Sequence, residues 1–326
     1  MKSLLSIMLG LLCSSCGPII DPTEQGNLVP FTVIEDSSLP KLIINGTALH
    51  LESFGNPSDP ILIFLHGGPG GDYRNAEQIK EIANEGYRVI LFDQRSTGLS
   101  QRHAYESINI EVLFEDLKQI IAHFKVSENQ KVFLFGHSWG GIYACGYIDR
   151  YPNEIDGVIF AEASGFTSDI LFDYGNDTRS PGFFTETLGN ITYLDQFLNA
   201  GKSDHEILDY KIAVYSAEQF SKDSPEGVPA PSPIWRFGAV ALNALTAYAK
   251  DQGYDFTKNI DMYQGHTLFI YGEKNEAYGL KSAKEDASFF QNHEIAEIKN
   301  TGHELIYFEW PQTKKVILKF LNEHSK

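Results

Sequence analysis

The sequence predicts an α/β fold, in which a mostly parallel central sheet carries helices on both faces and a helical lid is inserted into the chain. Short apolar runs of strand length, such as 61–65 and 130–135, alternate with segments whose apolar residues recur at helical spacing, such as 110–124. Between the run 130–135 and a helix-like segment at 142–150 stands Gly136-His137-Ser138-Trp139-Gly140. Glycines two before and two after a serine are typical of a sharp turn from a strand into a helix.

Composition places the chain among soluble globular proteins. The chain has 326 residues, of which 42% are hydrophobic and 21% are charged, so it is long enough for one large domain with an insertion. The formal net charge of -17 excludes a nucleic-acid partner, because binding phosphates requires a basic surface. We therefore expect a small-molecule or short-peptide substrate.

The first residues resemble an export signal. Residues 1–16 contain one lysine, a short apolar run and small residues, and the run is too short to anchor the chain across a bilayer. The ending Leu12-Cys13-Ser14-Ser15-Cys16 resembles a bacterial lipoprotein signal, in which Cys16 becomes the lipid-carrying first residue. An ordinary cleaved signal is the alternative. We expect an exported protein, anchored to a bacterial membrane if Cys16 is acylated and otherwise periplasmic or secreted, with residues 17–30 as a flexible tether.

The first part of the predicted core covers residues 31–165. It opens with two extended segments, 31–35 and 41–44, and Asn45-Gly46 then predicts a tight hairpin turn into the next strand. The remaining strands are expected at 48–54, 61–65, 87–92, 130–135 and 156–161, and the helices at 75–84, 110–124 and 142–150.

The alternation of strands and helices stops after residue 165 and resumes near residue 263. Residues 166–262 form the expected lid, with helix-like stretches near 184–199, 204–220 and 234–250. Residues 263–326 form the second part of the core, with strands at 267–271 and 294–299, a helix near 280–291 and a last helix from Pro311.

The turn at Ser138 indicates nucleophilic chemistry. A strand-turn-helix nucleophile within an α/β sheet predicts the α/β-hydrolase fold, where the triad runs in the order serine, acid, histidine. Such a fold needs a histidine in the loop after the last strand, and Gly302-His303-Glu304 supplies it, so His303 is the expected general base. The backbone N–H groups of Trp139 and Gly68 are the expected donors to the oxyanion of the tetrahedral intermediate.

Three motifs together resemble one branch of the α/β hydrolases, the prolyl aminopeptidases (proline iminopeptidases). They are HGGPG at 66–70, DQRSTGLS at 93–100 and GHSWG at 136–140, and the resemblance covers residues 60–165 and returns at the terminal Gly-His. It implies Ser138 as nucleophile, His303 as base, and oxyanion donors at Gly68 and Trp139. It also implies neither a metal nor a cofactor.

The acid of the triad departs from this family. There the acid stands three residues after the glycine that ends the strand before the last, which makes Gly272 the glycine and places Asn275 at the acid position. Asparagine can accept a hydrogen bond from histidine but cannot balance an imidazolium charge, and the equivalent change in a serine protease costs about 10⁴ in turnover. Glu162 and Glu276 are the alternative acids. We favour Glu162, because a carboxylate at the end of an apolar strand needs a partner.

The lid departs from the family as well. Prolyl aminopeptidases hold the substrate amine with lid glutamates, often within a Trp-Glu pair, whereas Trp235 is followed here by Arg236. The leading hypothesis is a serine hydrolase that cleaves a small amide or ester through an acyl-enzyme, as prolyl aminopeptidases do. A carboxylesterase with the same triad is the first alternative. A catalytically weak, surface-binding lipoprotein is the second.

Overall fold

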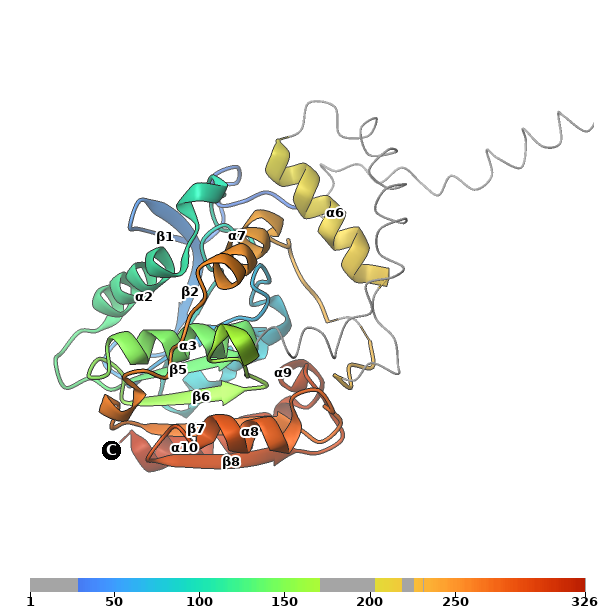
Figure 1. Cartoon of the computed structure of the whole chain (residues 1–326). Coiled ribbons are helices and arrows are strands. Elements are labelled where there is room, and N and C mark those ends of the chain that lie inside the picture. Colours follow the sequence, from blue (N-terminus) through green and yellow to red (C-terminus); the bar gives the residue numbers. More distant parts are fainter. Residues whose placement is uncertain (1–28, 171–202, 219–225, 231, 326) are drawn as a thin grey trace, which may run out of the picture.

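The computed structural model of the chain describes residues 29–170, 203–218, 226–230 and 232–325 (Figure 1). The predicted signal at 1–16 with Cys16, the tether up to residue 28 and the predicted lid helix at 184–199 lie outside the described residues. Within the described ranges, no helix has both the length and the apolar character that crossing a membrane requires.

A single sheet of eight strands organises the core, in the order β1-β2-β4-β3-β5-β6-β7-β8. Its strands are β1 (Lys41–Ile44), β2 (Thr47–Phe54), β3 (Ile61–Leu65), β4 (Arg88–Phe92), β5 (Val132–His137), β6 (Gly157–Ala161), β7 (His266–Gly272) and β8 (His293–Ile298). β1 and β2 pair antiparallel and β2 joins β4 antiparallel, whereas every pairing from β4 through β8 is parallel. The predicted fold class, a mostly parallel sheet, is confirmed.

Helices cover both faces of this sheet (Figure 1). α2, α3 and α8 pack on one face, and η1, α9 and α10 pack on the other. β3 is continuously apolar because it is buried on both sides. Ile61, Ile63 and Leu65 pack into the core on the face of α2 and α3, and Leu62 and Phe64 pack into the core on the face of η1 and α10. The helical elements are η1 (Arg74–Glu85), η2 (Tyr105–Ser107), α2 (Ile110–Phe124), α3 (Trp139–Arg150), α6 (Asp204–Glu218), α7 (Ala239–Asp251), η4 (Ile260–Met262), α8 (Gly279–Ala287), α9 (Leu305–Phe308) and α10 (Trp310–His324).

Residues 31–46, which lead into β1 and β2, confirm one prediction from the sequence and correct another. Asn45 and Gly46 form a two-residue turn between β1 and β2, with φ of 43° and 68°, as the Asn-Gly signal predicts. The expected extended segment at 31–35 is wrong, because the chain turns there. The Glu35 carboxylate accepts hydrogen bonds from the N–H and the hydroxyl of Thr32, and the N–H of Glu35 donates to the Thr32 carbonyl.

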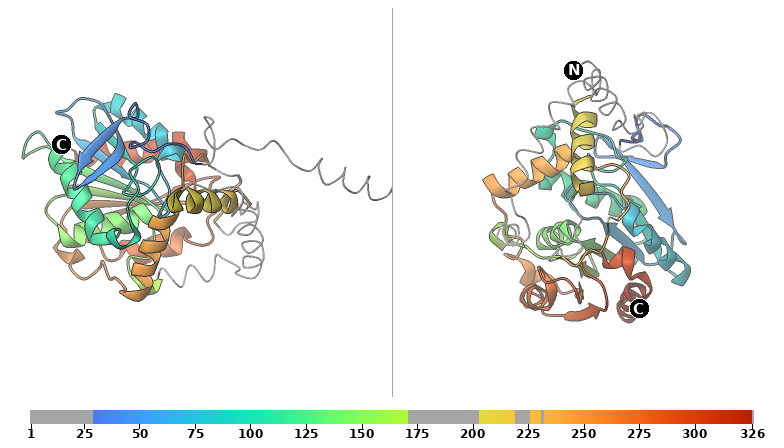
Figure 2. Two further views of the ribbon diagram at one scale, coloured as in Figure 1. Left: turned by 90° about the horizontal axis from the view of Figure 1, so that it is seen from above. Right: turned by 90° about the vertical axis from the view of Figure 1, so that its right-hand side faces the viewer.

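Two helices of the expected lid region lie between β6 and β7 in the sequence. α6 and α7 lie next to each other (Figures 1 and 2), and α7 packs Ala241, Ala244 and Leu245 against the core that α2 and α3 share. They stand on the side of the molecule where the parallel strands end. This edge is where an α/β sheet normally binds its ligands.

Candidate active site

Ser138 occupies a strained turn between β5 and α3. Its φ of 53° and ψ of -124° are unusual for a residue with a side chain, and it is half-buried. The surroundings leave no room for side chains at the flanking glycines. A Cβ on Gly140 would overlap the carbonyl oxygen of Leu65, and one on Gly136 would overlap that of Gly140. The turn therefore holds the Ser138 hydroxyl at the amino end of α3, whose first residue is Trp139.

The loop after β3 packs directly against this turn. A Cβ on Gly67 would lie 3.1 Å from the Cβ of Ser138, so glycine permits the close approach of the two backbones. Gly68 follows with a φ of 134°, which favours glycine. His66, at the start of this loop, is buried, and its Nε2 accepts a hydrogen bond from the N–H of Gln94 at 3.0 Å. The loop that carries Gly68 thus borders the nucleophile.

Glu162 follows β6 and is 2% exposed. Its N–H donates to the carbonyl of Ile270 at 2.9 Å, and the N–H of Ser138 donates to the carbonyl of Ala161 at 3.0 Å, so the strand ladders continue past the ends of β5 and β6. Oε2 of Glu162 lies 3.9 Å from Nδ1 of His303. Glu276, the alternative acid, is exposed on the turn after β7. The structure brings Glu162 to the histidine.

Asn275 is buried and faces Glu162. Its Nδ2 donates to Oε2 of Glu162, while the N–H of Gly272 donates to Oε1 of the same carboxylate. The Asn275 Oδ1 accepts the N–H groups of Ala277 at 3.0 Å and Tyr278 at 3.1 Å. The asparagine at the usual acid position therefore contacts the carboxylate that approaches His303.

The backbone of His303 is held from two sides. Its N–H donates to the carbonyl oxygen of Glu226 at 2.8 Å, and its carbonyl oxygen accepts a hydrogen bond from Nε2 of His137 at 2.7 Å. Burial, followed by the nearby His303, lowers the pKa of His137, which keeps its ring neutral with the proton on Nε2. Sequence analysis missed both partners. His137 stands within the nucleophile motif, but no local pattern identifies Glu226.

Charges around His303 alter its basicity. Burial is the largest contribution and lowers the pKa of the imidazole, but the interaction with Glu162 and the negative charges of Glu226 and Glu304 outweigh it and raise the pKa to about 9. The side chain of His303 is 12% exposed. A buried histidine beside several carboxylates is therefore charged at neutral pH in the free protein, and it becomes a neutral base in the alkaline range.

Buried ion pairs join α6 to Arg102 of the core and to Arg236 in the segment before α7. Asp209 of α6 accepts hydrogen bonds from Nε of Arg236 at 2.8 Å and from Nε of Arg102 at 3.0 Å, and its second oxygen accepts the N–H of Ala239 at 2.9 Å. Arg236, which follows Trp235 where the family often has a glutamate, thus pairs with Asp209 and joins α6 to the segment before α7. Asp72 of the loop after β3 adds a second attachment, since its Oδ2 accepts the N–H groups of Trp235 and Arg236 at 2.7 and 3.0 Å.

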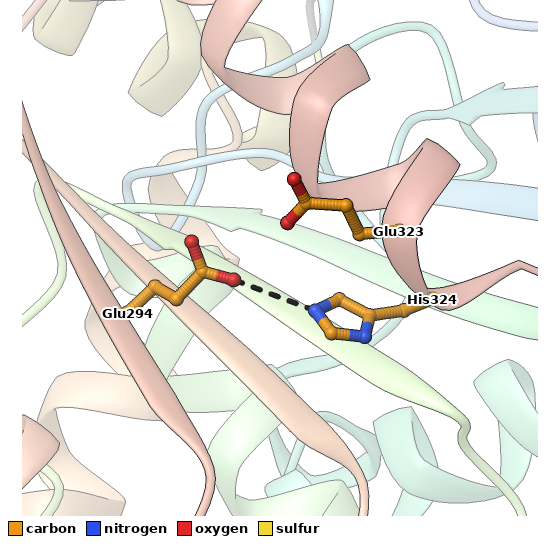
Figure 3. Close-up of side chains that lie close together, drawn as sticks. All are labelled: Glu294, Glu323 and His324. Atoms are coloured by element: carbon orange, nitrogen blue, oxygen red, sulfur yellow. Dashed lines mark hydrogen bonds and ion pairs between the residues drawn. The ribbon is translucent and has the colours of Figure 1, made fainter.

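One group of potential metal ligands occurs among the residues that the structure describes. Glu294 of β8 and Glu323 and His324 of α10 face one another, with ligand atoms within 4.8 Å (Figure 3). Lys319 forms ion pairs with Glu294 at 3.3 Å and with Glu323 at 3.9 Å, and Nε2 of His324 lies 3.4 Å from Oε1 of Glu294. Glu294 stands near the start of β8, whereas the active-site residues follow strand ends, so this group lies at the opposite edge of the sheet.

Comparison with known proteins agrees with this architecture. Residues 60–309 match the alpha/beta hydrolase fold family. The AB hydrolase superfamily protein YfhM of Bacillus subtilis is 34% identical over 116 residues, which cover 35% of this chain and 40% of that protein. The proline iminopeptidase of Arabidopsis thaliana is 35% identical over 112 residues, covering 34% of this chain and 28% of that protein.

The chain therefore spans less than half the length of either of these two relatives. Among solved structures, the proline iminopeptidase of Mycobacterium smegmatis superposes with a TM-score of 0.60 at 17% identity, covering 88% of this chain and 99% of that one. At this identity the likeness concerns the fold.

Proposed function

Because the chain belongs to the α/β-hydrolase fold family, we propose that it is a serine hydrolase that cleaves a small amide or ester through an acyl-enzyme. Ser138 is the nucleophile, His303 the general base and Glu162 the acid. The observation that carries this proposal is the placement of Glu162, 3.9 Å from His303, at the end of the strand that pairs with the strand leading into Ser138.

The reaction follows from these positions. The imidazole of His303 removes the Ser138 proton while Oγ forms a bond to the substrate carbonyl carbon, and the N–H groups of Trp139 and Gly68 hold the oxyanion. The imidazolium then protonates the leaving amine or alkoxide as its bond to carbon breaks. Water, deprotonated by His303, next attacks the acyl-enzyme carbonyl carbon. The imidazolium then returns the proton to Oγ of Ser138 as its bond to the acyl carbon breaks, and the acid product is released. Glu162 stabilises the imidazolium in both half-reactions.

The carboxylates around His303 favour a cationic substrate. Acyl transfer needs one acid, yet the charges of Glu226 and Glu304 also act on the histidine. We propose a substrate whose free amine lies near the scissile bond, as in an aminopeptidase of the prolyl type. The match to a proline iminopeptidase supports this substrate class.

Two assays test the proposal. An active-serine fluorophosphonate should label the wild-type protein and leave Ser138→Ala unlabelled; equal labelling of the two, or none of the wild type, contradicts a serine hydrolase and favours a surface-binding protein. Proline p-nitroanilide should then be turned over faster than short p-nitrophenyl esters. Turnover of the esters alone would replace the aminopeptidase with a carboxylesterase.

We also propose that the protein is exported and anchored by a lipid on Cys16. The lysine, the apolar run and the cysteine at the end of residues 1–16 support this proposal. When membranes of the producing cell are dissolved in detergent and the phases are separated, the protein should be found in the detergent phase. Cys16→Ala should move it to the aqueous phase, and an unchanged distribution would exclude the anchor.

A further inference from the structure

We propose that Asn275 is a positioning residue, which fixes the carboxylate of Glu162 in the orientation that His303 requires. This inference rests on the proposed function, since it assigns a role to the residue that stands where related enzymes carry their acid. In this chain the acid, Glu162, follows β6. Asn275, which stands after β7 where related enzymes carry the acid, holds the Glu162 carboxylate.

The contacts of Glu162 support this role. Both of its oxygens receive a donor from the segment after β7, the N–H of Gly272 on Oε1 and Nδ2 of Asn275 on Oε2. Oε2 is also the oxygen that lies 3.9 Å from Nδ1 of His303. A carboxylate with one donor could rotate about its last side-chain bond, whereas donors on both oxygens define its plane. The hydrogen bond from Asn275 therefore determines which lone pair of Oε2 faces the histidine.

Asn275 is itself held in one orientation. Its Oδ1 accepts two backbone N–H groups, those of Ala277 and Tyr278, at 3.0 and 3.1 Å. Turning the amide over would place its NH₂ group against these two donors and its oxygen against the carboxylate, and all three hydrogen bonds would be lost. The turn after β7 thus directs Nδ2 toward Glu162. The ring of Tyr278 lies 5.4 Å from the ring of His303, so the same turn also packs against the base.

Asparagine meets both needs of this position, and aspartate meets one. An aspartate would still accept the two N–H groups of the turn, so the local fold would be kept. It would present a second carboxylate to Glu162 at hydrogen-bond distance, however, and two buried carboxylates that close cannot both ionise without a large penalty. Asn275→Asp therefore keeps the acceptor for the turn and replaces the fixed N–H donor by a carboxyl group that can donate to Glu162 only while the pair holds a proton.

A double-mutant cycle tests the inference. The rate constant for fluorophosphonate labelling of Ser138 and the kcat of hydrolysis are measured for wild type, Asn275→Ala, Glu162→Gln and the double variant. Loss of a hydrogen bond to a charged group predicts a decrease of about 10- to 100-fold in kcat for Asn275→Ala, with KM little changed. In the Glu162→Gln background the same alanine should cost less than about threefold, because no carboxylate remains to be positioned. An equal loss in both backgrounds would show a merely structural residue and overturn the inference.

Asn275→Asp supplies a second readout that a structural role would not move. The two carboxyl groups should share one proton, whose loss adds a further ionisation to the kcat/KM profile and lowers thermal stability as the pH rises. Asn300→Asp is the matched control, because Asn300 is exposed on the loop that leads to His303. An Asn275→Asp profile that coincides with that of Asn300→Asp contradicts the inference. Failure of the proposed function is seen separately, as a wild type that does not label at Ser138.

Discussion

The strand-end corner around Ser138 and the lid are built in different ways. The corner consists of the segments that follow β3, β5, β6, β7 and β8. Backbone hydrogen bonds between β5, β6 and β7 continue past the strand ends and fix the positions of the segments that follow these strands. The described lid helices meet the core differently: α6 through the buried ion pair of Asp209 with Arg102, and α7 through the apolar residues Ala241, Ala244 and Leu245. Side chains in the corner are therefore placed by the sheet register, whereas α6 depends on buried ion pairs and α7 on apolar packing against the core.

The largest expected effect lies in the corner. Glu162→Gln keeps the size of the side chain and removes the charge that balances the imidazolium, so kcat/KM should fall by about 10³- to 10⁴-fold. Because Glu162 raises the pKa of His303, whose value is about 9, the acidic limb of the kcat/KM profile should also move to lower pH. Steady-state kinetics from pH 6 to 10 measure both effects.

Glu276→Gln is the matched control, since Glu276 is the exposed carboxylate on the neighbouring turn. Its kinetics should match those of the wild type. If this variant alone lost activity, Glu276 rather than Glu162 would be the acid, and the register of β6 would have no part in catalysis.

The attachment of α6 should be the most sensitive to a single substitution. Asp209→Asn leaves Arg102 and Arg236 buried beside a neutral amide, and breaking a buried ion pair in this way costs about 3–5 kcal/mol. We expect earlier urea unfolding and faster hydrogen exchange of α6 and α7 than of β5 and β6. Asp204→Asn, an exposed change on the same helix, should leave both unchanged. Uniform loss of protection across core and lid would show that the two regions do not differ in this respect.

Asp286 is a buried carboxylate of the core, and its replacement by asparagine should stabilise the protein, whereas the same replacement at Asp209 should destabilise it. Burial raises the pKa of Asp286 in α8 to about 7, so its folded form binds a proton more tightly than its unfolded form does. Its contribution to stability is present below about pH 4 and is lost as pH rises through 7. Asp286→Asn should therefore stabilise the protein by about 1–2 kcal/mol above pH 7 and have little effect at pH 4. Thermal unfolding at both pH values measures this, and equal shifts at the two would contradict it.

The smallest effect is expected where the lid region meets the corner. Glu226→Gln removes a negative charge that acts on His303 and leaves in place the Glu226 carbonyl that holds its N–H. KM for an amine-bearing substrate should rise about tenfold, which corresponds to the free energy of about one partly buried ion pair. KM for a neutral ester should change little. Glu304→Gln, which removes a charge near the same histidine, is the comparison. Equal changes for both substrates would indicate that Glu226 does not recognise the amine.

Much of the corner could be predicted because its signals are local. The apolar run 61–65 and the helical spacing at 110–124 reflect burial on two faces and on one face, and both elements occur at those residues. The glycines around Ser138 reflect backbone contacts within a few residues of the turn, apart from the approach of Leu65 to Gly140. The extended segment expected at 31–35 failed for the opposite reason, since the Glu35 side chain competes with an extended backbone.

The strands of the sheet, the nucleophile turn and a histidine after the last strand could be read from local patterns, because periodicity and steric demand act over short stretches of chain. Only the tertiary structure decided that Glu162, rather than Glu276, lies beside His303, and that Asn275 holds it. It also decided that Arg236 belongs to an ion pair with Asp209 and that Glu226 borders the histidine. These contacts join residues far apart in the chain, and their existence depends on the register of β6 against β7 and on the placement of the lid, which no local pattern records.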